Sequence, residues 1–257
     1  MRRSALALLG LLALPAAATA QTGPLLGNEP PPERLPEARF AVTPWIGVRI
    51  PYNTGGYVVL TDVGDQFSVR EERGGATMVG ADVEARLRGP VSVVFGGAFA
   101  TAEQDILTIV DAADETLALS TDGPAMWMAK AGVRVRLPDP IPDNRRFHPS
   151  AFITVAPAMV WMDWDDIEGA PDAITGTTRH FALNLAADAT TRIGRNGNWA
   201  LQIGLEDFLT FWDADAIRVR DEALGPGRFG GDSVLIDYDY SQSNILAARL
   251  GVSYRFR

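Results

Sequence analysis

The sequence predicts an all-β protein, an eight-stranded antiparallel up-and-down β-barrel that crosses a membrane. Three observations support this fold class. Eight segments alternate apolar with polar or small residues, the connections between them alternate in length, and the chain begins with an export signal. Alternation with a period of two is typical of β-strands, whose successive side chains point to opposite faces. Short connections at one end and long ones at the other are typical of a transmembrane barrel.

The first twenty residues have the features of a cleavable secretory signal. Arg2 and Arg3 form a basic start, a short apolar stretch follows, and residues 18–20 (Ala-Thr-Ala) form a small-residue cleavage site. The apolar stretch is too short to span a membrane, which favours a cleaved signal over an anchor. We therefore expect residues 1–20 to be a signal peptide cleaved near Ala20. Residues 21–38, which are rich in proline, would form a periplasmic leader, and residues 39–257 the barrel.

Composition excludes several classes of function. The chain of 257 residues contains no cysteine, so the exported protein has no disulfide and no thiolate metal site. The net charge of −9 argues against a nucleic-acid partner. Hydrophobic residues make up 47% of the chain but occur in short alternating runs. After the signal, no run is long enough for a transmembrane helix, and this distribution suits a barrel.

Each expected strand has one apolar face, except residues 150–162, which are apolar on both faces. In residues 76–88, for example, Val83 lies on the apolar face and Glu84 on the opposite one. Two irregularities stand out. Pro44 cannot donate a backbone hydrogen bond, which suggests a bulge or break, and the alternation slips near Asp207, which suggests another bulge. The expected strands cover residues 39–50, 76–88, 91–102, 125–137, 150–162, 179–193, 198–211 and 244–257.

The connections predict which end of the barrel faces outward. Long connections cover residues 51–75, 103–124, 163–178 and 212–242, whereas 89–90 and 194–197 are short turns and 138–149 is of intermediate length. With eight strands, both ends of the domain lie on the short-turn side, which we assign to the periplasm. The long connections are acidic: residues 103–123 carry six acids and no base, and residues 163–178 carry five acids and no base. Alternation at 106–110 and 115–120 suggests that some strands extend beyond the bilayer as hairpins.

The charged faces of the strands predict an internal ionic network. The interior of an eight-stranded barrel is only wide enough to be filled by side chains. Opposite charges must pair there, because an unpaired buried charge is costly. We therefore expect a lumen closed by ion pairs. The residues expected to point inward are Asp82, Glu84, Arg86, Lys130, Arg134, Arg136, Asp188, Arg192, Glu206 and Arg249.

Aromatic residues near the strand ends predict the two girdles that mark the membrane boundaries of a barrel. An adhesive loop tip is the alternative for the segment around Tyr238 and Tyr240. The candidate girdle residues are Trp127, Trp161, Trp164, Trp199, Trp212, Phe211, Tyr238 and Tyr240.

The last strand carries a family resemblance. Leu250, Val252, Tyr254 and Phe256 share one face, and Arg257 follows the phenylalanine. Together with the strand count, the loop alternation and the opening segment FAVTPWIGVRI, this end resembles the small eight-stranded outer-membrane barrels of the OmpA/OmpX/OmpW-like group. The resemblance implies a bacterial outer-membrane location. It also implies that the four residues form the signal read by the barrel assembly machinery.

Two weaker site hypotheses concern a cluster of acidic residues and a histidine. Asp163, Asp165, Asp166 and Glu168 crowd oxygen ligands that suit Ca²⁺, but their spacing departs from an EF-hand loop. A solvated acidic loop is therefore favoured. His180 near the outer rim could serve a lipid-modifying enzyme, yet no serine motif accompanies it. We expect no catalytic residue, no cofactor and no metal.

The sequence therefore predicts a non-enzymatic outer-membrane barrel with a filled polar lumen and long acidic extracellular loops. Its role would be structural or would involve surface interaction, and its partners would be outer-membrane lipid, the assembly machinery and an unknown extracellular partner of the loops. One alternative is a narrow porin-like channel for small solutes. Another is a soluble periplasmic lipocalin-like barrel, which would turn its apolar side chains inward to bind a ligand.

Overall fold

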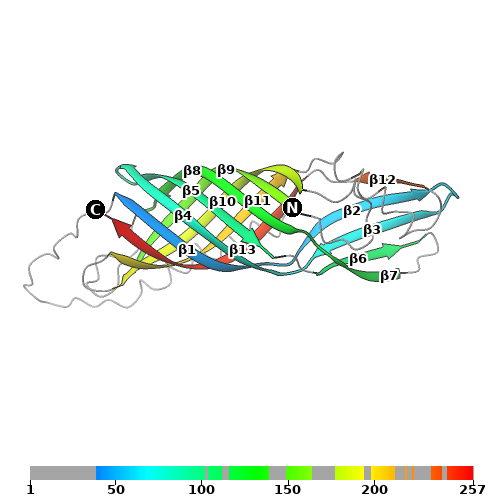
Figure 1. Cartoon of the computed structure of the whole chain (residues 1–257), viewed down its shortest axis with the longest axis horizontal. Coiled ribbons are helices and arrows are strands. Elements are labelled where there is room, and N and C mark those ends of the chain that lie inside the picture. The colour runs from blue at the N-terminus through cyan, green and yellow to red at the C-terminus, as the bar shows by residue number, and fades with distance from the viewer. Residues whose placement is uncertain are drawn as a thin grey trace, which may run out of the picture.

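The computed structural model describes residues 39–101, 104–111, 116–138, 149–163, 177–193, 198–211, 218, 222, 233–238 and 242–256. The expected signal peptide and leader, residues 1–38, lie outside these ranges. The described chain forms thirteen β-strands, arranged as a closed barrel and a second sheet beyond one end of it (Figure 1). None of the described helical residues belongs to a helix long and apolar enough to cross a membrane.

Eight strands close the barrel in the order β1-β13-β11-β10-β9-β8-β5-β4, and every neighbouring pair is antiparallel. The barrel closes because β1 pairs with both β13 and β4. The predicted fold class is confirmed, with strands close to the expected ranges. The barrel strands are β1 (Phe40–Arg49), β4 (Ala76–Arg88), β5 (Val91–Ala100), β8 (Ala125–Arg136), β9 (Pro149–Asp163), β10 (Thr177–Ile193), β11 (Trp199–Phe211) and β13 (Gln242–Phe256).

The barrel turns its apolar side chains outward. Val83, Val133 and Leu250 are 45%, 45% and 51% exposed, whereas the neighbouring inward residues Arg134 and Arg249 are buried. Successive side chains of a strand point to opposite faces, so the same alternation places lumen and outer surface on every strand. A water-soluble barrel would instead carry polar side chains on its outer surface and apolar side chains inside.

Neither expected position carries a bulge, but Pro44 does interrupt one ladder. The β1–β4 register runs through Pro44, which pairs with Ala81, without a shift. The β1–β13 pairing is interrupted at Thr43 and Pro44, which fits the break expected there. Along β11 the register with both neighbours is continuous through Asp207, so Asp207 points outward and the buried Phe208 points into the lumen. The apparent slip in the sequence is therefore a change from polar to apolar residues on the inward face. Within the barrel, a register shift occurs between Arg86 and Arg88 on β4.

The second sheet prolongs one side of the barrel wall. Its order, β12-β2-β3-β6-β7, matches the order β13-β1-β4-β5-β8 of the adjacent barrel strands, each of which is its neighbour in sequence. Figure 1 shows these strands continuing past the barrel end. We call this the protruding sheet. Its strands are β2 (Tyr52–Thr61), β3 (Gln66–Arg73), β6 (Gln104–Val110), β7 (Thr116–Asp122) and β12 (Val234–Tyr238).

The protruding sheet is formed mainly by two of the long connections. Residues 51–75, which were expected to be a loop, form the β2–β3 hairpin. Residues 104–122 contain the antiparallel β6–β7 pair, as the alternation at 106–110 and 115–120 predicts. Gly64, in the β2–β3 turn, has a φ of 92°, a left-handed conformation that favours glycine. A small apolar cluster lies on one face of the sheet and includes Tyr57, Val59 and Val69.

Aromatic side chains mark both ends of the outer barrel surface. At the end nearest the protruding sheet, Phe99 contacts Trp127 and Phe181 stacks on Phe211, with ring centroids 4.5 and 5.9 Å apart. At the short-turn end, Trp199 and Phe256 both contact Tyr254, at 4.7 and 4.8 Å. Of the other girdle candidates, Trp161 is half-buried on β9, and Tyr238 lies on β12, away from the barrel. Trp164, Trp212 and Tyr240 lie outside the described residues.

Candidate functional site

The middle of the lumen is filled by a cluster of charged side chains, which we call the ionic belt. Its members come from β4, β8, β10, β11 and β13 and are all buried. It contains three acidic and three basic side chains, so its formal charges balance. The ionic belt consists of Asp82, Lys130, Arg134, Asp188, Glu206 and Arg249.

Arg249 is the centre of the ionic belt. One terminal nitrogen, Nη1, donates to Asp82 Oδ2 at 2.9 Å and to Glu206 Oε2 at 2.8 Å. The other, Nη2, donates to both carboxylate oxygens of Asp188 at 2.8 Å, and Nε donates to Asp188 Oδ1 at 3.1 Å. A planar guanidinium presents five N–H donors in a fixed fork and can engage several carboxylates at once. Arg249 thereby links β13 to β4, β10 and β11.

Two further cations complete the ionic belt. Lys130 Nζ pairs with Asp82 Oδ1 at 3.1 Å and also with Glu206, and the Asn184 amide donates to Glu206 at 2.9 Å. Arg134 pairs with Asp188 at 3.3 Å and, towards the short-turn end, with Glu84 at 3.1 Å. Because each carboxylate faces at least one cation, the cost of burying the charges is offset by mutual attraction.

Glycines make room for the ionic belt. A Cβ atom added to Gly96 would lie 2.1 Å from Asp82 Oδ1 and 2.7 Å from Lys130 Cε, and one added to Gly204 would lie 2.1 Å from Asp188 Oδ1. All three distances are shorter than any normal contact of a Cβ atom. These inward positions are therefore limited to glycine by the charged side chains beside them.

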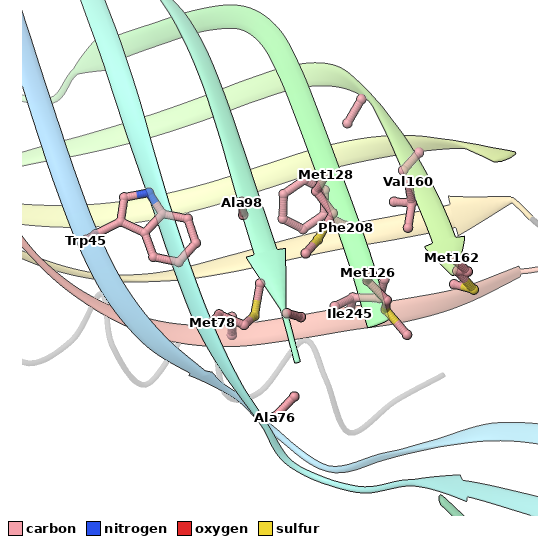
Figure 2. Packing of buried hydrophobic residues seen from close by; sticks show 14 residues of the cluster. Trp45, Ala76, Met78, Ala98, Met126, Met128, Val160, Met162, Phe208 and Ile245 are labelled. Atoms are coloured by element: carbon pink, nitrogen blue, oxygen red, sulfur yellow. The ribbon is translucent and has the colours of Figure 1, made fainter. Parts of the chain in front are cut away.

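In the half of the lumen nearer the protruding sheet most buried side chains are apolar, which departs from the expectation of a polar lumen. Met78, Met126 and Met162 are connected through the strand ladder, because Met78 and Met126 both pair with Ala100, and Met126 pairs with Met162. Phe208 and Ile245 pack in the same cluster (Figure 2). We call this the apolar layer. At its outer side Arg49 and Arg73 donate to the sulfur atoms of Met126 and Met162, at 3.6 and 3.8 Å.

The short-turn end of the lumen opens into a small cavity, which we call the vestibule. It has a volume of about 60 Å³ and is lined by residues that include Glu84, Arg136 and Arg192. Arg86, also in its wall, donates to the carbonyl of Gly89 at 2.6 and 3.0 Å. Of the ten residues expected in one network, the structure therefore brings six together in the ionic belt and places these four around the vestibule.

The remaining site candidates lie elsewhere. Leu250, Val252 and Phe256 are exposed on the outer face of β13, and Tyr254 is half-buried on the same face. Asp163 is the last residue of β9, whereas Asp165, Asp166 and Glu168 lie outside the described residues, so the Ca²⁺ hypothesis stays a prediction. His180 is buried in the outer lumen, with Nε2 2.9 Å from the Thr178 hydroxyl. In the described ranges, no group of three or more His, Cys, Asp or Glu is placed to hold a metal ion.

Sequence reasoning missed the apolar layer, although a signal for it was present. Met126 and Met128 have the same parity as Lys130 on β8, so the alternation already places them in the lumen. The missing information was height along the barrel, which depends on how neighbouring strands are staggered.

The chain is similar to several solved structures of bacterial outer-membrane and surface proteins, all at low sequence identity. OprG of Pseudomonas aeruginosa is 13% identical and has a TM-score of 0.45, covering 86% of this chain and 96% of that one. A neisserial surface protein, NspA, is 9% identical with a TM-score of 0.40, covering 85% and 98%. AlkL in DMPC bilayers is 11% identical with a TM-score of 0.41, covering 90% and 97%. The sequence matches no protein-family model and no curated protein. The closed eight-stranded antiparallel barrel of this structure agrees, at the level of fold, with the predicted resemblance to small eight-stranded outer-membrane barrels.

Replacing Gly96 with alanine should destabilise the barrel by about 2 kcal/mol, because the new methyl group overlaps Asp82 and Lys130. Gly97→Ala is the matched control. It lies on the outer face of the same strand, where an added Cβ meets nothing closer than the Met128 carbonyl oxygen at 3.4 Å. Urea unfolding of the reconstituted barrel measures both. Equal stability of the two variants would contradict the role assigned to Gly96.

Replacing Arg249 with methionine should destabilise the barrel by about 3–5 kcal/mol, because three buried carboxylates lose their shared cation. Lys130→Met should cost less, about 2 kcal/mol, since Asp82 and Glu206 remain paired with Arg249. Arg88→Met, on the exposed end of β4, serves as the control and should be nearly neutral. Urea midpoints in the reverse order would show that Arg249 is not the centre of the network.

Proposed function

We propose that the protein is a bacterial outer-membrane barrel with a closed lumen and no catalytic activity, which presents the protruding sheet and acidic loops outside the cell. The observation that carries this proposal is the direction of the side chains, apolar outward and ionic inward. An apolar outer surface is stable against hydrocarbon and unstable against water. Cleavage near Ala20, the periplasmic leader and recognition of Leu250, Val252, Tyr254 and Phe256 by the assembly machinery belong to the same proposal.

The height of the outer surface supports a membrane location. Trp199 and Phe211 lie at opposite ends of β11, twelve residues apart. At about 3.3 Å per residue and a tilt of about 40°, they are separated by roughly 30 Å along the barrel axis. This is close to the thickness of a bilayer's hydrocarbon core, which is about 30 Å. The aromatic residues thus have the spacing of two membrane boundaries.

The direction of the side chains also bears on the alternatives. A lipocalin-like barrel needs an apolar cavity inside and polar residues outside, whereas here the inward side chains include six buried charges. A channel needs a continuous polar path. The ionic belt fills the centre of the lumen, and the apolar layer beyond it offers a passing ion few hydrogen-bonding partners.

A structural or surface-interaction role is what this architecture supports best. Five of the barrel strands continue into the protruding sheet, which lies on the side that we assign to the cell exterior. His180 is 1% exposed on the inward face of β10, so its imidazole is not accessible to a substrate in this structure. We propose that the acidic loops bind the extracellular partner. Because the chain is acidic, this partner is not expected to be a nucleic acid.

Ile203→Arg should separate a membrane barrel from a soluble one. Ile203 is 55% exposed on the outer face of β11, and an arginine facing the bilayer interior costs about 2–4 kcal/mol. Val63→Arg is the control, because Val63 is 70% exposed in the β2–β3 turn, beyond the barrel. We expect the first variant alone to lose stability in lipid vesicles and to be depleted from the outer-membrane fraction. Two equally neutral variants would favour the soluble alternative.

Planar-bilayer recordings test whether the lumen is closed. We expect the purified barrel to give no large steady conductance, because the ionic belt and the apolar layer block the lumen in series. Lys130→Gly combined with Glu206→Gly removes a buried pair from the belt and should increase ion flow. Steady open levels in the unmodified protein would instead support the narrow channel.

A further inference from the structure

We propose that the vestibule is a binding site for a phosphate-class oxyanion. The cavity of about 60 Å³ opens at the short-turn end of the barrel, below the ionic belt. A buried water requires about 10–15 Å³ of such volume, so the vestibule has room for several waters or one tetrahedral anion. This inference goes beyond the proposed structural role and does not depend on which side of the membrane the vestibule faces.

The charge of the vestibule is strongly positive. Glu84 is the single acidic residue in its described wall, whereas six arginines line it. The Glu84 carboxylate already accepts a hydrogen bond from Arg134 at 3.1 Å, which reduces its repulsion of an incoming anion. The arginines are Arg39, Arg86, Arg134, Arg136, Arg192 and Arg255. Guanidinium groups bind phosphate oxygens through paired, charge-assisted hydrogen bonds.

Two buried donors in the wall have no hydrogen-bond acceptor within the protein. They are Nε of Arg134 and Nε2 of Gln202, whose side chains are 3% and 2% exposed. The other ends of these side chains are engaged: Arg134 pairs with Glu84 and Asp188, and its Nη2 donates to Gln202 Oε1 at 3.5 Å. A buried donor without an acceptor is costly. An oxyanion in the vestibule would supply the acceptors that both groups lack.

Further donors of the right kind surround this pair. The buried hydroxyls of Ser92 and Ser253 line the vestibule, and so does Arg255, which donates to Thr190 Oγ1 at 3.5 Å. Hydroxyl, amide and guanidinium donors converging on one small space match the several acceptor oxygens of a tetrahedral anion. Among the described residues of the wall, arginines outnumber the single carboxylate of Glu84, so the site favours anions over cations.

Calorimetric titration of the mature, folded chain in a zwitterionic detergent tests the proposal. We expect saturable binding of inorganic phosphate at constant ionic strength, with chloride as the competing salt. Arg255→Gln and Gln202→Glu should each weaken binding by about tenfold, since one removes a cation and the other places a negative charge where the orphan amide stands. Arg88→Gln removes an arginine from the exposed end of β4, outside the vestibule, and should change the affinity by less than about twofold.

Heat-modifiable gel migration confirms that each variant is folded, and two further ligands distinguish the sources of the phosphate group. Binding of glycerol 3-phosphate alongside inorganic phosphate would indicate a free phosphate or a phosphomonoester. Binding of dihexanoyl phosphatidylglycerol alone would indicate a lipid headgroup. Both outcomes support an oxyanion site. Absence of saturable binding for all three ligands, or an equal loss of affinity in Arg88→Gln, would overturn it.

Discussion

The burial of Arg249 is the constraint on which the rest of the barrel depends. A guanidinium in a closed lumen has no access to bulk water, so its charge must be balanced by protein groups. Asp82, Asp188 and Glu206 supply that balance from three other strands. These four residues can meet at one height only if the strands are correctly staggered. The ionic belt therefore specifies the register of the barrel as well as filling its centre.

The requirements of the ionic belt extend to residues that carry no charge. Gly96 and Gly204 are small because Asp82 and Asp188 occupy the space that their side chains would need. Further out, the lumen is wide enough for methionine and phenylalanine, and the inward face becomes apolar. Methionine suits such an irregular space because its side chain is flexible, and its sulfur can accept the weak hydrogen bond that Arg49 donates. Along the barrel axis, the paired charges and the glycines that make room for them are thus followed by apolar packing.

Most of the fold could be predicted from the sequence because alternation with a period of two is a local property. Each barrel strand could be recognised without knowledge of its neighbours. The layers of the site were harder to predict. The height of an inward residue along the barrel axis depends on how neighbouring strands are staggered, which the sequence of one strand does not reveal. The predicted bulge at Asp207 was wrong for this reason. Phe208 follows it on the inward face, and an apolar inward residue resembles a phase slip until the apolar layer is known. The β2–β3 hairpin was missed because its length suggested a loop.

In the closed lumen that we propose, the layering gives two barriers that work by different physical effects. An anion entering from the vestibule meets arginines that attract it, and then the ionic belt, whose cations are already paired with carboxylates and whose side chains fill the lumen. A cation is repelled by the vestibule first. Either ion would next meet the apolar layer, where few groups can replace its hydration shell. Loosening the ion pairs alone would leave this second barrier in place, so any conductance gained from the Lys130→Gly and Glu206→Gly pair should remain far below that of an open porin. The attraction at the entrance and the exclusion above it together describe a site that can hold an anion without conducting it.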